Sequence, residues 1–225
     1  MRDWSDVTAI FGGTFDPPHL GHMEAVKGLF TAPRVKQVRV VPSAHPPHKR
    51  TMTAETHRVK MTKLAFLRSI DTVVDPQEVE RARLTGRPSY TYETLQALRN
   101  QIGPELAFVI GTDQLQDLSK WYRFPELLGL SHWIVLERKG QDSPLRALTE
   151  WQGSGLIKTQ KTGTEHPTFE LSAPKPTFLT VVPTPARELS SHKIRERIAV
   201  LGDVPAELLS PDVISYLKQN HLYGT

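Results

Sequence analysis

The stretch GGTFDPPHLGH, residues 12–22, directly follows the apolar run VTAIF at residues 7–11. The apolar run is short, rich in β-branched residues and ended by two glycines, which is typical of a buried strand. Beyond the two prolines, apolar residues recur at helical spacing over residues 19–30. A strand, a glycine-rich turn and a helix in this order predict one unit of an α/β fold.

The same alternation continues along the chain and predicts a Rossmann-like, doubly wound, mostly parallel sheet with helices on both faces. In the helix expected over residues 54–69, Val59, Leu64, Phe66 and Leu67 form the apolar side. The charged run 78–83 is expected to be a strand at a sheet edge. The other expected strands are 37–41, 72–74, 106–111, 133–137 and 177–182, and the other expected helices are 91–102, 190–200 and 210–225.

The chain length of 225 residues is typical of one domain. We expect a single domain over residues 1–225, with a C-terminal helical segment from about residue 190. Residues 140–175 are rich in Gly, Ser, Thr, Pro and Lys and show little periodicity. They predict an irregular excursion with weak strands and not a separate domain.

Composition narrows the class of protein. The chain has no cysteine, which excludes disulfides, a thiolate nucleophile and cysteine-ligated zinc. No apolar stretch has the length of a signal-peptide core or of a membrane span, so a cytoplasmic protein without a membrane partner is expected. The net charge of +4 favours acidic ligands such as nucleotides. No basic run interleaved with aromatic residues predicts nucleic-acid binding.

The turn at residues 12–22 predicts an anion site. Gly12 and Gly13 allow a phosphate or ribose to approach the backbone, and Thr14 adds a hydroxyl. His19 and His22 lie three positions apart in or near the first helical turn, so they are expected to share one face. Helix N-termini attract anions, and two imidazoles add donors for phosphate oxygens, which favours phosphoryl or nucleotidyl transfer. Zinc bound by these histidines together with the histidines at 45 and 48 is the alternative.

Six blocks along the chain carry a family resemblance. GGTFDPPHLGH is followed by PPHK at 46–49, HRVKM with Arg58, SYTYETL at 89–95, IGTDQL and KWY within 110–122, and SSHKIR at 190–195. In this order the blocks resemble the bacterial nicotinate-nucleotide adenylyltransferases of the H-x-G-H nucleotidyltransferase superfamily. The resemblance runs from residue 7 to about residue 200.

The resemblance implies a reaction and its site residues. The phosphate of nicotinate mononucleotide would attack the α-phosphorus of ATP and release pyrophosphate in NAD biosynthesis. Magnesium would bind through the ATP phosphates and not to a dedicated protein site. The implied catalytic residues are His19, His22, Lys49 and Arg195. The implied ATP contacts are Gly12, Gly13, Thr14, Phe15, His19, His22, Gly111, Asp113, Ser190, Ser191 and Arg195. The implied nicotinate mononucleotide contacts are Thr14, Lys49, Tyr90, Thr91, Trp121 and Tyr122.

Several of these residues have a structural alternative. Trp121 would stack on the pyridine ring, or it would anchor the segment 124–128. Asp113 would bind a ribose hydroxyl, or it would cap the following helix, and Tyr90 would line the site or pack in the core. Ser190 and Ser191 precede a helical pattern as a natural N-cap.

The sequence also departs from the family pattern. His192 stands where the family usually has threonine, and Leu189, Glu93 and Thr112 replace other frequent residues. The alternative functions are pantetheine-phosphate adenylyltransferase and a non-catalytic nucleotide-binding protein of the same fold. The oligomeric state stays open, with a homodimer as one alternative.

Overall fold

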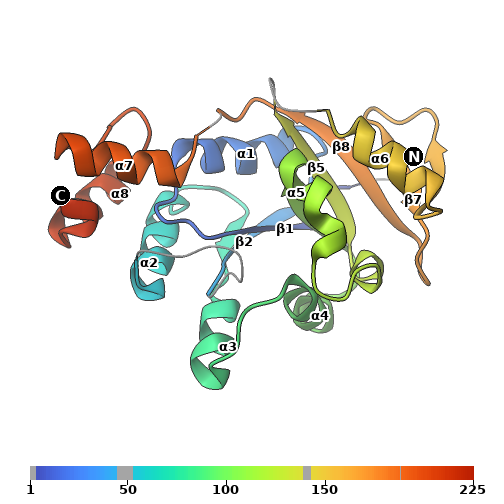
Figure 1. Ribbon diagram of the computed structural model, residues 1–225, viewed down its shortest axis with the longest axis horizontal. Coiled ribbons are helices and arrows are strands. Elements are labelled where there is room, and N and C mark those ends of the chain that lie inside the picture. Colours follow the sequence, from blue (N-terminus) through green and yellow to red (C-terminus); the bar gives the residue numbers. More distant parts are fainter. Residues whose placement is uncertain (1–3, 45–52, 139–142, 188) are drawn as a thin grey trace. The chain divides into compact units, whose positions relative to one another are not determined.

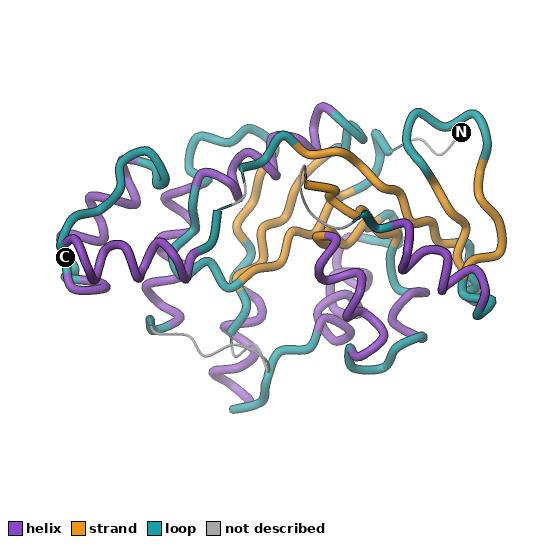
Figure 2. Tube along the Cα trace, turned by 45° about the horizontal axis from the view of Figure 1, so that its top comes forward, coloured by secondary structure: helices purple, strands orange, loops and turns teal. Residues whose placement is uncertain are grey.

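The structure is a computed structural model that describes residues 4–44, 53–138, 143–187 and 189–225. Its chain alternates between strands and helices, as Figures 1 and 2 show. In this part of the chain the sheet has the strand order β3-β2-β1-β4-β5-β8-β7-β6. The first five positions follow the doubly wound order, in which strand order reverses beside β1. The predicted fold class is therefore confirmed.

The strands are β1 Thr8–Gly13, β2 Gln37–Pro42, β3 Thr72–Val74, β4 Leu106–Gly111, β5 His132–Arg138, β6 Ile157–Lys161, β7 Thr168–Leu171 and β8 Thr177–Thr184. The helices are α1 Leu20–Thr31, α2 Glu55–Ala65, α3 Gln77–Thr85, α4 Thr91–Ile102, α5 Thr112–Asp117, α6 Leu145–Gly153, α7 Ser191–Leu201 and α8 Pro211–Gln219, with short 3-10 turns at Leu118–Lys120, Glu126–Gly129 and Leu222–Gly224. None of the helices in the described residues combines the length and hydropathy that a membrane crossing needs.

The chain divides into two compact units, and the first comprises residues 1–11, 28–38 and 90–185. In this unit β1, β4, β5 and β8 pair in parallel, with Ile10 opposite Phe108 and Trp133 opposite Leu179. β4 is buried along almost its whole length, which is typical of a parallel strand covered on both faces. Trp133, on β5, is fully buried at the centre of this core.

The segment 140–175 has the strands that were expected in it, but it is more regular than the expected irregular excursion. In its described part it contains α6 and a hairpin of β6 and β7, which pair antiparallel, and β7 continues antiparallel onto β8. Ala147, Leu148 and Trp151 form the buried side of α6. The segment therefore extends the sheet by two strands. The sparse apolar residues concealed its regularity, because short strands at a sheet margin need few of them.

The second unit comprises residues 12–27, 39–89 and 186–225, and it includes α2, α3, α7 and α8. In this unit α8 packs against α2, and α7 contacts the turn Leu222–Gly224 (Figure 1). The expected edge strand at 78–83 is wrong, because these residues lie within helix α3. Val79 and Ala82 are buried three positions apart on one helix face, and Gly86 ends the helix in the left-handed conformation, with φ +68°.

The apolar side expected for α2 is only partly correct: Phe66, just after the helix, is 3% exposed and Val59 is partly buried, but the main buried face is a different one. Its buried side consists of Arg58, Met61, Thr62 and Ala65, whereas Leu67 is 66% exposed beyond the helix end. These four residues stand at positions i, i+3, i+4 and i+7, which form one face of a helix. The face that packs against the core therefore includes Arg58 and Thr62. A fully buried arginine is rare, and periodicity alone does not predict it.

Candidate active site

His19 and His22 form a stacked pair at the start of α1. Their ring centroids are 3.6 Å apart and the ring planes differ by 17°. The backbone N–H of His19 donates to Nδ1 of His22 at 3.2 Å, and the backbone N–H of His22 donates to Nδ1 of His19 at 3.3 Å. Because each Nδ1 accepts a hydrogen bond, each neutral ring carries its proton on Nε2. The pair therefore presents two Nε2–H donors from one helix end.

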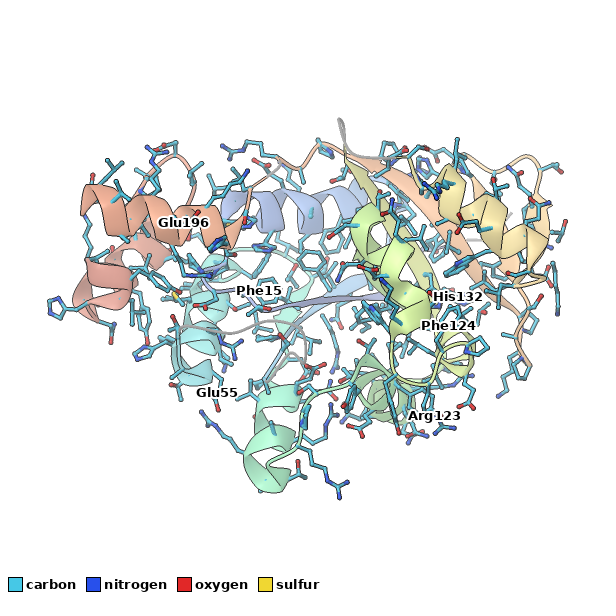
Figure 3. All side chains as sticks on the ribbon, viewed as in Figure 1. Phe15, Glu55, Arg123, Phe124, His132 and Glu196 are labelled. Carbon is cyan, nitrogen blue, oxygen red and sulfur yellow. The ribbon has the colours of Figure 1, made fainter. Side chains whose placement is uncertain are left out.

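Tight packing holds this pair in place. Phe15, labelled in Figure 3, is 1% exposed, and its ring meets His22 edge-on with centroids 5.0 Å apart. A Cβ at Gly13 would lie 2.7 Å from the Phe15 ring. A Cβ at Gly21 would lie 2.7 Å from the carbonyl oxygen of Arg187 and 3.2 Å from Nδ1 of His19. Both glycines are therefore required for close packing around the histidines.

The turn ahead of the histidines is tied to α7. Arg195 Nη1 donates to the main-chain oxygen of Asp16 at 2.6 Å and lies 3.9 Å from its carboxylate. Ser191 Oγ donates to the carbonyl of Pro17 at 2.8 Å. Ser190 occupies the N-cap position of α7 as expected, but its side chain makes no capping hydrogen bond. The structure thus brings Ser191 and Arg195 to the turn that carries His19.

Asp16 is 2% exposed and also accepts a hydrogen bond from the Tyr223 hydroxyl at 2.6 Å. Burial raises the pKa of Tyr223 above its ordinary value, and the Asp16 carboxylate acts in the same direction. Tyr223 lies in the turn after α8 and has φ +60°. The hydroxyl therefore stays protonated and acts as a donor to the carboxylate.

Arg58 holds the backbone behind this turn. The side chain is 1% exposed and donates to four main-chain oxygens: Thr14 at 2.9 Å, Ser43 at 2.6 Å, Ala44 at 2.8 Å and Thr53 at 3.2 Å. Burial lowers the pKa of this guanidinium, while nearby Asp16 and other acidic groups act in the opposite direction. The arginine thus fixes the loop that follows β1 to the loop that follows β2.

The residues expected around the nicotinate ring form an aromatic group in the first unit. The rings of Tyr90 and Tyr122 have centroids 4.6 Å apart, and Trp121 meets Phe108 edge-on at 6.1 Å. Trp121 is half-buried, whereas Tyr122 is 50% exposed. Thr91 is the first residue of α4. N–H groups in a first helical turn have no acceptor within the helix, so they can bind a carboxylate.

Gly111 is the last residue of β4, and Asp113 lies in the helix that follows it. Gly111 is the N-cap of α5, and its N–H donates to Oε1 of Gln114 at 3.1 Å. The helix begins at Thr112, so the alternative of Asp113 as the helix cap is wrong. Asp113 is exposed in the first turn of α5, where its carboxylate can reach a ligand hydroxyl.

Other expected residues have different outcomes. Lys49 lies outside the described residues, as do the histidines at 45 and 48. His192, the departure from the family pattern, is 70% exposed and lies 3.3 Å from Glu196 on the surface of α7. Within the described ranges, no three His, Asp or Glu side chains gather in a group that could hold a metal ion.

Three residues around the turn were not assigned a role from sequence. Gly21 lies inside the quoted motif, and Arg58 lies on a helix face with Met61 and Ala65, so both left a weak signal. Tyr223 left none, because its partner Asp16 is 207 positions away.

Comparisons with known proteins agree with this geometry. Residues 10–197 match the model of the cytidylyltransferase-like family. The chain is 36% identical to a probable nicotinate-nucleotide adenylyltransferase of Stenotrophomonas maltophilia over 95% of each chain. It is 34% identical to the nicotinate-nucleotide adenylyltransferase of Salmonella typhimurium, over 96% of this chain and 97% of that one.

Solved structures match the fold. A nicotinic acid mononucleotide adenylyltransferase of Plasmodium falciparum complexed with NaAD aligns with a TM-score of 0.72, at 18% identity, over 97% of each chain. Together with the stacked histidines after β1 and the doubly wound sheet, these matches show that the chain belongs to the cytidylyltransferase-like family and, within it, to the nicotinate-nucleotide adenylyltransferases, which are nucleotidyltransferase enzymes.

Proposed function

We propose that this chain joins ATP to nicotinate mononucleotide, with His19 and His22 stabilising the charge that develops on the ATP phosphates. The observation that carries this assignment is the reciprocal pair of N–H to Nδ1 hydrogen bonds. It fixes both Nε2 atoms as donors before substrate binds, so no reorganisation is needed during the reaction. Preorganised donors of this kind are typical of sites that stabilise transition-state charge.

The chemistry needs little else from the protein. The nucleophile is the phosphate of nicotinate mononucleotide, which is already ionised at neutral pH, so no general base is required. Its oxygen attacks the α-phosphorus of ATP, the bond to the β-phosphate oxygen breaks, and pyrophosphate leaves with the electron pair. Catalysis then depends on bringing anions together and stabilising their charge. Magnesium enters as part of the MgATP substrate, held by the phosphates.

We propose the nucleotide contacts that the family resemblance implies, and the geometry within each unit supports them. Gly12, Gly13 and Thr14 are proposed to hold the nucleotide at the end of β1, because glycines there admit a close backbone approach. Ser190, Ser191 and Arg195 are proposed to hold the triphosphate at the start of α7, where helix N–H groups favour anions. Phe15 supports His22 by ring contact. Lys49, which the family resemblance adds as a further cation, keeps its proposed role at the phosphates.

The nicotinate side is assigned to the aromatic group. Trp121 is proposed to stack on the pyridine ring, and the N–H groups of Thr91 and Tyr122 to bind the carboxylate. Contact between the Tyr90 and Tyr122 rings supports this, since it holds residue 122 beside the start of α4. Gly111 and Asp113 are proposed to contact the adenosine ribose. ATP and nicotinate mononucleotide are thus the proposed partners.

The test measures pyrophosphate release with MgATP and one of three acceptors: nicotinate mononucleotide, nicotinamide mononucleotide or phosphopantetheine. Release chiefly with the nicotinate form is expected. His19→Ala is expected to lower kcat by about 10²–10³-fold, the usual cost of one transition-state donor, while ATP binding persists.

His166→Ala is the matched control, since His166 lies between β6 and β7, outside both groups of residues. Turnover with phosphopantetheine would contradict the substrate assignment. ATP binding without turnover by any acceptor would favour a non-catalytic protein, and full activity of His19→Ala would contradict the mechanism.

A further inference from the structure

Several contacts from residues 189–225 fasten the turn that precedes α1. Besides the bonds from Arg195 and Ser191, the N–H of Leu20 donates to the carbonyl of Leu208 at 2.9 Å. The Tyr223 hydroxyl donates to Oδ1 of Asp16 at 2.6 Å. The histidine pair therefore depends for its position on a segment far away in sequence.

Tyr223 contacts Asp16, which is the buried acidic residue nearest to the histidines along the chain. Asp16 is 2% exposed and precedes His19 by three residues. A buried carboxylate is costly unless it is paired and hydrogen-bonded. A short hydrogen bond to a charged oxygen is about twice as strong as a neutral one. Tyr223 thus supplies one of the interactions that keep this carboxylate, and the turn that carries it, in one arrangement.

The turn around Tyr223 has a defined conformation that its own hydrogen bonds maintain. His221 has φ +50° and Tyr223 has φ +60°, the left-handed region that bulky residues rarely adopt. Thr225 Oγ1 donates to the carbonyls of Leu217 and Leu222, both at 3.0 Å, and so closes the turn against α8. Such strain persists only where surrounding contacts over-determine it, and it is concentrated at functional sites.

We propose that Tyr223 is a positioning residue for adenylyl transfer: through Asp16 it holds the turn that places the His19–His22 pair. This inference rests on the proposed function of the histidines. In this role Tyr223 does not contact the substrate, and it acts by limiting the movement of the turn. A displacement of about 1 Å at reacting groups can cost about 10²-fold in rate, even when the change is remote.

The experiment compares Tyr223→Phe with Tyr216→Phe in the pyrophosphate-release assay with the full chain. Tyr216 lies on α8, and its hydroxyl lies 2.8 Å from Nδ1 of His57, so the control removes the same group from the same part of the chain. Tyr223→Phe is expected to lower kcat by about 10- to 100-fold, with KM for ATP changed by less than about threefold, because transition-state contacts are affected more than ground-state ones. Tyr216→Phe is expected to keep kcat within about twofold of wild type.

A double-mutant cycle with Asp16→Asn tests the route. If Tyr223 acts through Asp16, the kcat effects of the two substitutions are expected to be clearly less than additive. Additive effects, or a rise in KM that accounts for the whole loss, would overturn the inference. Equal kcat for Tyr223→Phe and Tyr216→Phe would overturn it too, even with a lower unfolding temperature for Tyr223→Phe.

The outcomes separate this inference from the proposed function. A wild-type chain that releases no pyrophosphate contradicts the function itself, whereas an active wild type with an equally active Tyr223→Phe contradicts only the positioning role. Circular dichroism establishes that each variant folds. If Tyr223→Phe does not fold, Asp16→Asn alone decides: lower kcat at unchanged KM supports the inference, and unchanged kcat overturns it.

Discussion

Replacement of Arg58 by methionine is expected to destabilise the protein strongly. Methionine has a similar length and fits an apolar helix face, but it donates no hydrogen bond. The substitution leaves four main-chain oxygens, at Thr14, Ser43, Ala44 and Thr53, without the donors that now reach them. Since Arg58 is 1% exposed, water does not replace those donors without opening the structure.

The size of the effect follows from these contacts. Each buried carbonyl left without a partner costs about 1–3 kcal/mol, and removal of the buried guanidinium charge offsets part of the sum. A net loss of about 3–5 kcal/mol is expected, as for other broken buried polar networks. For a chain of this size, that loss lowers the unfolding midpoint by roughly 6–20 °C. Activity is expected to fall as well, because Thr14 belongs to the turn after β1.

The assay is chemical denaturation followed by circular dichroism, with thermal unfolding beside it. Arg99→Met is the matched control, because Arg99 Nη1 donates to two main-chain oxygens, of Gly129 and Leu130, from a half-buried position. The control is expected to cost about 1–2 kcal/mol. If Arg58→Met unfolds within about 1 kcal/mol of wild type, the assigned role of the buried network is refuted.

Two further predictions concern the same turn. Gly21→Ala is expected to lose about 1–3 kcal/mol of stability together with activity, because its Cβ would press on the Arg187 carbonyl and the His19 ring. Gly28→Ala on the same helix would make only ordinary contacts and is expected to be tolerated. Equal unfolding midpoints for the two variants would contradict this prediction. Burial and the adjacent carboxylate raise the pKa of Tyr223 above its unfolded value of about 10. The stabilising effect of the Tyr223 hydroxyl is therefore complete below pH ~10 and is lost as pH rises toward the folded pKa. Above pH ~10 wild type is expected to lose stability faster than Tyr223→Phe, and parallel curves of stability against pH would exclude the effect.

Local patterns were a reliable guide where one face of an element was apolar throughout. The strands at Thr72–Val74 and Leu106–Gly111 and the helix at Thr91–Ile102 have the expected bounds. The strand expected at 78–83 is wrong because the highly charged run was interpreted as an exposed strand at a sheet edge. Its buried apolar residues, Val79 and Ala82, are three positions apart, which is the helical spacing.

Short stretches of sequence are sufficient to predict the strand–turn–helix unit at residues 7–31, the convergence of His19 and His22 and the class of chemistry. These features depend on backbone preferences and side-chain spacing within a few turns of chain, so a short window of sequence carries them. The grouping of Tyr90 with Tyr122 also followed the family motifs, although sequence alone gave no distance between them.

The contacts that hold this unit in place became evident from the folded structure. Arg58 donates to carbonyls of two separate connections, the one after β1 and the one between β2 and α2, and Tyr223 reaches Asp16 across 207 positions of chain. A buried arginine and a distant hydroxyl look like ordinary surface residues in a sequence, because their partners are main-chain oxygens and a single carboxylate. Hydrogen bonds of this kind depend on where distant segments meet after folding, and local sequence periodicity carries no information about those meeting points.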